Sequence, residues 1–224
     1  MRIRNLLMIL TLGACCSTGV AETIAYWRFG DQGLNDVSGN GHALVNSNVD
    51  IDSTGAAIFN GTNAWLETAE TLDLSGYNKL TVECFVKFPA AGVAGEIFAF
   101  TPEGAPQFQL AAADGVLSAK VVPGTGGINV ETADIPTDGD WHHVAMIIDG
   151  YAAGASRVRL YVDGVRATTH VERVNWTVPF TAGTFELGAG FNGQVSSVRI
   201  TTGVVAPVDF LAERQKSGMS FIIR

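Results

Sequence analysis

Residues 141–164 constrain the fold more than any other stretch of the chain. They read WHHVAMIIDG, then a short loop rich in glycine and alanine, then SRVRLYVDG. Both halves are rich in β-branched and aromatic residues, which pack well on a pleated sheet. The second half ends in Asp163-Gly164, a dipeptide typical of tight hairpin turns. The stretch therefore predicts two long strands at the centre of an all-β sandwich.

The remaining sequence continues this pattern with short strands. Residues 80–88 (LTVECFVKF) alternate, so Cys84 shares a face with the valines, while Glu83 lies on a more polar face that we expect to be partly exposed. Turns formed by glycine, proline and aspartate recur roughly every 8–12 residues, a spacing typical of sandwiches. Residues 207–216 (PVDFLAERQK) are the only helix-like stretch, with proline at the start. We predict a two-sheet antiparallel fold with one short C-terminal helix.

The first 21 residues predict an export signal. Two arginines precede an apolar run over residues 6–12, and Ala21 ends a group of small residues that suits signal peptidase. The run is far shorter than the roughly 20 apolar residues of a membrane helix, so we expect no transmembrane segment. The predicted organisation is a signal peptide over 1–21, one domain over 22–216 and a tail over 217–224.

A second interpretation of the N-terminus is a lipoprotein signal. Residues 12–15 (LGAC) resemble a lipobox, in which Cys15 would carry the lipid anchor. We therefore expect a secreted, extracellular or periplasmic protein, or one lipid-anchored at the cell surface. After cleavage at Ala21 the chain keeps one cysteine, Cys84, so no disulfide forms within it. Its place in residues 80–88 predicts a buried core thiol.

The charge of the chain excludes some partners. There are 22 acidic and 14 basic residues, a formal net charge of −8, and the basic residues form no cluster. Nucleic-acid binding needs a positive patch that faces the phosphates. We therefore predict no nucleic-acid partner.

Six motifs in chain order resemble the laminin G-like jelly-roll modules of the concanavalin A-like lectin/glucanase superfamily. They are AYWRF (25–29), DVSGNGH (36–42), AIFNG (57–61), LTVECFVK (80–87), WHHVAMIIDG with VRLYVDGV (141–165), and FNGQV with VRI (191–200). The resemblance covers about residues 24–216. It implies two antiparallel sheets packed face to face with jelly-roll connections. The roles of the family are mostly non-catalytic: carbohydrate binding, adhesion, or service as an accessory to a secreted hydrolase.

Residues 36–42 are the candidate metal site. Calcium takes six to eight oxygen ligands from carboxylates and carbonyls; Asp36 offers a carboxylate, and Asn40 and His42 offer backbone carbonyls. The resemblance implies one structural calcium ion here, completed by acids from a late strand. This chain has Ser196-Ser197 in place of those acids, which weakens the ligand set. The alternative is a glycine-rich turn held by Asx-type hydrogen bonds.

His142 and His143 are adjacent on a predicted strand, so their side chains point to opposite faces. They are therefore not expected to share one metal ion. We expect one of them to pack inward with a hydrogen bond to the backbone, and the other to be partly exposed.

Catalytic carboxylates are not evident in the sequence. Glycosidases place two carboxylates on either side of the scissile bond, and the retaining glucanases of the superfamily carry them as E-x-D-x-E on one strand. Glu67, Glu70 and Asp73 have a helical spacing, and Glu131 and Asp134 have the wrong parity to share one face of a strand. No Gly-x-Ser-x-Gly elbow occurs. We therefore predict that the chain is not an enzyme.

Exposed aromatic rings are candidate sugar contacts. Trp27, Trp141 and Trp65 lie in predicted strands and are assigned to the core, whereas Trp176 lies in a polar stretch and Tyr151 in a loop. We predict a secreted or surface-attached, non-catalytic module that binds a polysaccharide or other glycan through Trp176 and Tyr151. One alternative is a structural or adhesive module for an extracellular protein, and another is a polysaccharide hydrolase or lyase with atypical catalytic residues.

Overall fold

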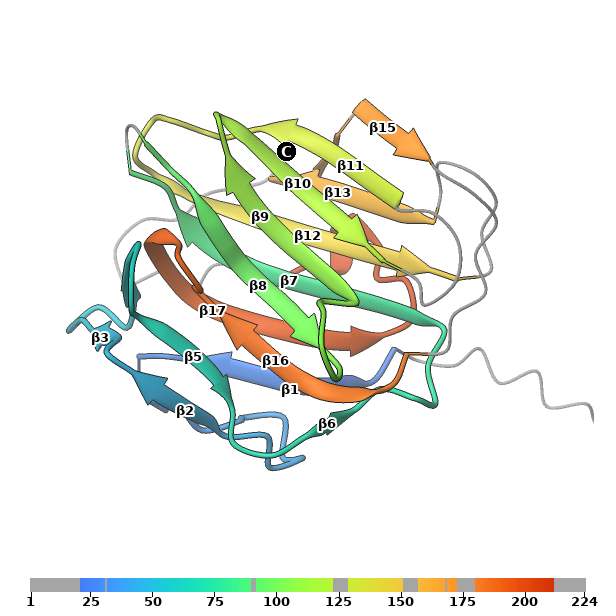
Figure 1. Ribbon diagram of the computed structural model, residues 1–224, viewed down its shortest axis with the longest axis horizontal. Helices are drawn as coiled ribbons and strands as arrows, with labels where there is room; N and C mark the ends of the chain where they lie inside the picture. The colour runs from blue at the N-terminus through green and yellow to red at the C-terminus, as the bar shows by residue number, and fades with distance from the viewer. Residues whose placement is uncertain are drawn as a thin grey trace, which may run out of the picture.

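The protein is a sandwich of two antiparallel sheets packed face to face, which confirms the predicted all-β jelly-roll class (Figure 1). The computed structural model describes residues 21–30, 32–89, 92–122, 129–150, 157–167, 169–172 and 180–211. Among these residues one sheet has eight strands and the other nine. In Figure 1 the nine-stranded sheet faces the viewer, with β8, β9 and β10 in front of β7 and β12.

The eight-stranded sheet contains β1 (Thr23–Arg28), β3 (Asp50–Ile51), β4 (Ala57–Asn60), β7 (Lys79–Lys87), β12 (Trp141–Asp149), β13 (Val158–Val162), β14 (Val165–Arg166) and β17 (Asn192–Thr202). Its order is β14-β13-β12-β7-β17-β4-β3, and β1 also pairs with β17. The predicted strands within residues 141–164 are β12 and β13, and they lie next to each other. Strand β12 also pairs with β7 along its whole length, which places it in the middle of the sheet.

The nine-stranded sheet contains β2 (Leu44–Ser47), β5 (Trp65–Thr68), β6 (Leu72–Asp73), β8 (Gly95–Thr101), β9 (Phe108–Ala113), β10 (Val116–Val121), β11 (Asn129–Asp134), β15 (Thr169–Glu172) and β16 (Ala182–Leu187). Its order is β15-β11-β10-β9-β8-β16-β5-β2, and β6 also pairs with β16. Strands β8 to β11 form a meander of consecutive neighbours. The pairings β8–β16 and β7–β17 join segments that are distant in the sequence, so the two sheets are interleaved along the chain.

The two inner faces meet in one apolar core. Trp27 is fully buried and stacks on Phe185 with ring centroids 5.5 Å apart, which confirms that Trp27 belongs to the core. Cys84 is a fully buried free thiol, as predicted, and burial, followed by the Glu83 charge, raises its pKa. A neutral thiol in such a place packs as a small apolar side chain. Trp141 and Trp65, by contrast, are only partly buried.

The outer face of β7 differs from the prediction that it would be partly exposed. Thr81 and Glu83 are 0% exposed, because the chain after β17 crosses this face. The Thr81 hydroxyl donates to the Gly203 carbonyl and accepts the Val205 N–H, while the Leu211 N–H donates to Glu83. The alternating pattern of β7 was predicted correctly. The segment over 203–211 covers the outer face of β7, and no local sequence pattern in β7 indicates this contact.

The predicted C-terminal helix is present only as a single turn of 3-10 helix, Pro207–Asp209. Phe210 is extended, with φ −62° and ψ 160°. Its ring packs on His143 at a centroid distance of 5.0 Å, so the chain leaves the helical path to reach the sheet. The predicted residues 212–216 lie outside the described residues. Within the part of the chain that the structure describes, no helix has the length and hydropathy to cross a membrane.

Candidate functional site

The outer face of the nine-stranded sheet carries a row of side chains that is polar on four of its five strands and has the apolar Ala99 on the fifth. Strand register places Lys120 beside Gln109, Gln109 beside Ala99, Ala99 beside Glu186, and Glu186 beside Glu67. The row therefore crosses five neighbouring strands, β10, β9, β8, β16 and β5. Because side chains alternate along a strand, the buried residues next to this row, such as Phe108 and Phe185, point into the core. The row itself points outward.

Three carboxylates gather at one end of this row. Glu186 and Glu67 are directly opposite each other on β16 and β5, and Glu96 lies on β8 just before a break in strand register. All three are partly buried. Burial raises the pKa of Glu186, and the charges of Glu67 and Glu96 raise it further. Burial also raises the pKa of Glu96, and the positive charge of Lys120 lowers it by a smaller amount. Carboxyl groups with perturbed pKa values are typical of functional sites, although structural clusters show them too.

Trp65 adds an aromatic ring to the same face. It lies two residues before Glu67 on β5, and the buried Leu66 between them points into the core. Sequence reasoning assigned Trp65 to the core and discarded Glu67 because its spacing from Glu70 looked helical. The signal that would have found both is the alternation of residues 65–68 behind the Asn60-Gly61 turn. An aromatic ring beside hydrogen-bonding groups can stack on an apolar ring face and bind the polar groups at its edge.

Asp36 holds the loop over residues 36–42 by accepting four hydrogen bonds. One carboxylate oxygen accepts the N–H groups of Tyr26 at 2.9 Å and Ser38 at 2.8 Å. The other accepts the Ser38 hydroxyl at 2.8 Å and the His42 N–H at 3.1 Å. Burial raises the pKa of Asp36, but these hydrogen bonds outweigh it, so the pKa lies below its usual value. The Asx-bonded turn offered as the alternative for this loop is thus present.

Of the two backbone carbonyls predicted as metal ligands, that of His42 accepts a hydrogen bond, and the side chain of Asn40 anchors its own part of the loop. The His42 carbonyl accepts the Trp27 indole N–H at 2.6 Å, and the Asn40 amide donates to the Thr23 and Ile24 carbonyls. Ser197 pairs with Arg28 of β1, and the Ser196 carbonyl accepts the Phe29 N–H.

Hydrogen bonds already occupy the carboxylate that would bind a calcium ion in this loop. An ionised carboxylate has about four lone-pair sites, and on Asp36 four hydrogen bonds fill them. Elsewhere in the described ranges, no group of three or more His, Cys, Asp or Glu side chains could hold a metal ion. The calcium ion therefore stays a prediction, and its binding would require Asp36 to exchange hydrogen bonds for the metal.

His142 and His143 point to opposite faces of β12, as expected, but their environments differ from the prediction. Both are buried, and both contact carboxylates through their rings. His143 lies 2.9 Å from Glu83, which also binds the Arg199 guanidinium. Burial raises the pKa of Glu83, but the hydrogen bonds from His143 and Leu211 and the charge of Arg199 lower it more, so the net shift is downward.

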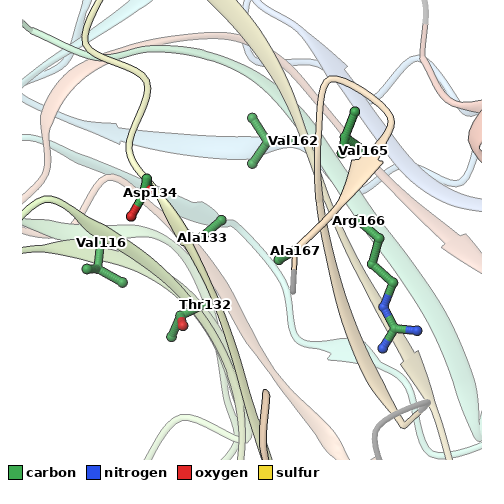
Figure 2. Close-up of a pocket in the computed structure, with 8 residues that line it drawn as sticks. All are labelled: Val116, Thr132, Ala133, Asp134, Val162, Val165, Arg166 and Ala167. Carbon is green, nitrogen blue, oxygen red and sulfur yellow. The ribbon is translucent and has the colours of Figure 1, made fainter. Parts of the chain in front are cut away.

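A groove lies at the rim between the two sheets (Figure 2). Its volume is about 410 Å³, and it runs between strands β10 and β11 on one side and the β13–β14 hairpin on the other. Figure 2 shows Asp134 and Arg166 on opposite sides of the groove, with Ala133 and Ala167 between them. Val165, in the hairpin, is 72% exposed. The guanidinium of Arg166 binds Glu131 through two nitrogens, which orients it.

Three predicted functional residues, Trp176, Tyr151 and Cys15, lie outside the described residues. They therefore stay predictions.

Comparison with known proteins places this arrangement in a family. The Laminin_G_3 model, described as Concanavalin A-like lectin/glucanases superfamily, matches residues 60–207. No curated protein sequence matches the chain.

Solved structures with the same fold include binding domains of botulinum neurotoxins. The receptor-binding domain of the C/D mosaic serotype has 12% identity and a TM-score of 0.67, over 84% of this chain and 49% of that one. The binding domain of serotype DC in complex with SialylT has 9% identity and a TM-score of 0.69, over 84% and 50%. The same domain in complex with rat synaptotagmin II has 9% identity and a TM-score of 0.68, over 84% and 50%.

These structures share the fold, and this chain spans about half the length of each of them. The family match covers well over half of the 224 residues. The chain is a laminin G-like member of the concanavalin A-like lectin/glucanases superfamily.

Proposed function

We propose that the chain is a non-catalytic module that binds a glycan on the outer face of its nine-stranded sheet. The observation that carries the proposal is the position of Trp65, on the same face of β5 as Glu67. Glu67 lies opposite Glu186, and the same row continues to Gln109 and Lys120. An aromatic ring can stack on a sugar ring, and carboxylates, amide and ammonium groups can bind its hydroxyls. One neighbouring structure supports a binding role, since the binding domain of botulinum neurotoxin DC is in complex with SialylT in one case and with rat synaptotagmin II in another.

A glycan array with the exported domain tests this proposal. We expect wild type to bind one class of glycan and Trp65→Ala to lose about tenfold in affinity, the effect of truncating an aromatic anchor. Glu103→Gln, which changes an exposed acid outside the row, is the matched control and should bind as wild type does.

The predicted contacts Trp176 and Tyr151 enter the same experiment as Trp176→Ala and Tyr151→Ala. Loss of binding in these variants, with Trp65→Ala unaffected, would move the site away from the sheet face. An array on which wild type binds no glycan would instead favour the alternative of an adhesive module for an extracellular protein.

A second candidate function rests on the pair Glu67 and Glu186. Residues directly opposite on antiparallel strands have Cβ atoms about 4.5–5.5 Å apart, so the two flexible glutamate side chains can reach the carboxyl separation of about 5–5.5 Å found in retaining glycosidases. The raised pKa of Glu186 suits a general acid, with Glu67 as the nucleophile. Release of reducing ends from a polysaccharide panel, abolished in Glu186→Gln, would support this hydrolase; no release by wild type would exclude it for that panel.

We also propose that the module works outside the cytoplasm. The support is the N-terminal pattern of charged, apolar and small residues that ends at Ala21, with Cys15 as the alternative lipidated residue. Mass spectrometry of the mature N-terminus separates the two: a chain that begins at Glu22 was cleaved by signal peptidase, and an acylated Cys15 marks a lipid anchor.

A further inference from the structure

His142 is held between two carboxylates from different parts of the chain. It lies near the start of β12 and is 9% exposed. Its Nδ1 is 2.7 Å from Oδ2 of Asp163, and its Nε2 is 2.8 Å from Oδ1 of Asp138. Asp163 begins the turn between β13 and β14, and Asp138 precedes β12. One imidazole ring thus ties two separate loops to the same strand.

The turn at Asp163 is connected to β12 by more than this contact. The second oxygen of Asp163 accepts the His143 N–H at 2.9 Å, and the Asp163 N–H donates to the His143 carbonyl at 2.8 Å. Asp163 and Gly164 have φ values of 50° and 75°, the left-handed conformation of a two-residue hairpin turn. Asp138 accepts the Asp140 N–H at 3.0 Å with the oxygen that contacts His142.

The two contacts of His142 require both ring nitrogens to donate. A neutral imidazole has one N–H and one lone pair, whereas the imidazolium has two N–H donors. In the neutral form, one nitrogen would present its lone pair to a carboxylate, which has no proton to donate. Only the protonated ring satisfies Asp138 and Asp163 together.

We propose that His142 is a pH-operated latch on the β13–β14 turn. The protonated ring bridges Asp138 and Asp163 and fixes the turn against β12, and deprotonation releases one of the two carboxylates.

Within the part of the chain that the structure describes, no other charge that faces His142 opposes this arrangement. Val86, opposite His142 on β7, is apolar, and Lys87 lies beside Trp141 with its side chain on the other face of the sheet. Asp140, in the preceding turn, adds a further negative charge. Burial lowers the pKa of His142, but the hydrogen bonds and charges of Asp163 and Asp138 outweigh it and raise the pKa above its usual value. The latch is therefore complete below the ordinary histidine pKa and opens as the pH rises through the raised one.

The latch acts on one wall of the groove in Figure 2. Val162 and Val165, which flank the Asp163-Gly164 turn, line this groove, and Arg166 follows in β14. A released turn allows these side chains to move relative to β11. The shape of the groove is therefore coupled to the protonation of His142.

NMR on the folded chain tests the latch. We expect the ring of His142 to titrate above 6.5, its usual value, and the protection factors of the 163–165 amides to fall about tenfold across that titration. Tenfold corresponds to about 1.4 kcal/mol, close to one hydrogen bond to a charged group. Asp138→Asn keeps the acceptor for Asp140 but removes the charge, and should lower the His142 pKa and remove the pH dependence of the protection.

The matched control is Asp140→Asn, which should retain the pH dependence. Asp140 lies in the same turn, but among the described hydrogen bonds its side chain makes none to His142. Protection factors that stay constant while His142 titrates would overturn the proposal, as would a His142 pKa at or below 6.5. Both measurements use wild type, so they remain decisive if Asp138→Asn does not fold.

Discussion

Asp36 and Glu83 show how single carboxylates organise this chain. Asp36 accepts two hydrogen bonds on each oxygen and so closes a glycine-rich loop. Glu83 is completely buried and binds Arg199, His143 and the Leu211 N–H. A buried charge is tolerated only when it is paired and hydrogen-bonded. At both positions the carboxylate joins segments that the local sequence does not connect.

Substitution of Asp36 tests the hydrogen-bonded description of its loop. We expect Asp36→Ala to lower the free energy of unfolding by about 2–4 kcal/mol, because it leaves several backbone donors without their acceptor. The free energy of unfolding of Asp36→Asn should lie between those of wild type and Asp36→Ala, since an amide keeps one acceptor oxygen. Urea denaturation measures the change. Asp50→Ala, at an exposed position in β3, should change the free energy by less than about 0.5 kcal/mol.

Thermal unfolding in excess EDTA separates the two descriptions of the same loop. Because hydrogen bonds fill the acceptor positions of Asp36, we expect the Tm to be unchanged by EDTA and by added calcium. A Tm that falls in EDTA and recovers with calcium would show that the predicted ion binds.

Glu83 makes stability depend on pH in the acid range. Its pKa lies below the usual 4.5, so its contribution is complete above pH 4.5 and is lost as the pH falls through the lower folded value. We expect the free energy of unfolding of wild type to fall across this window. Glu83→Gln should be about 3–5 kcal/mol less stable at pH 7, since Arg199 loses its partner, and less dependent on acid pH. Glu103→Gln should retain the acid dependence of wild type; equal slopes for Glu83→Gln and wild type would contradict the assignment.

At the scale of elements, the segment after β17 acts as a strap across the eight-stranded sheet. It is held at intervals: Val205 by Thr81, Asp209 by Arg199, and Leu211 by Glu83. Phe210 packs between the rings of His143 and Tyr161, with centroids 5.0 and 5.4 Å away. This packing explains why the predicted helix ends at Asp209: extended backbone at Phe210 lets its ring reach the sheet.

A pair of substitutions in this strap tests its attachment. We expect Phe210→Ala to increase hydrogen exchange at Val205 and Leu211 by about tenfold, since loss of a packed ring costs a kilocalorie or more. The control is Val208→Ala, a position two residues before Phe210 that is 90% exposed, and this variant should exchange as wild type does. Equal exchange in both variants would mean that the polar contacts alone hold the strap.

At the scale of the whole molecule, the two sheets share one core. Buried residues from β1, β7, β12 and β17 pack with those from β8, β9 and β16 in a single apolar cluster. Trp27 of the first group stacks on Phe185 of the second. Neither sheet could expose its inner face to water without a large loss of hydrophobic stabilisation.

The shared core predicts one cooperative unfolding transition for the two-sheet sandwich. We expect calorimetry of the chain to give one peak whose calorimetric and van't Hoff enthalpies agree. Two resolved transitions, or a van't Hoff enthalpy well below the calorimetric one, would show that the sheets unfold separately.

The sequence by itself determined the class of fold and its central strands. Alternation in residues 80–88 and the β-rich halves of residues 141–164 depend only on local periodicity, and Asp163-Gly164 depends only on the conformational freedom of the two residues in a tight turn. The sequence also determined that Cys84 is buried and offered the Asx-bonded turn at Asp36 as an alternative, because both inferences depend only on residues within a few positions along the chain.

Only the tertiary structure decided which polar side chains meet one another. Glu67 meets Glu186, and His142 meets Asp163, because antiparallel register brings distant strands and turns together. Glu83 is buried because the strap over 203–211 returns to β7 from more than a hundred residues away. A side-chain pattern records which face of a strand a residue occupies, but what covers or opposes that face is set by contacts between distant segments.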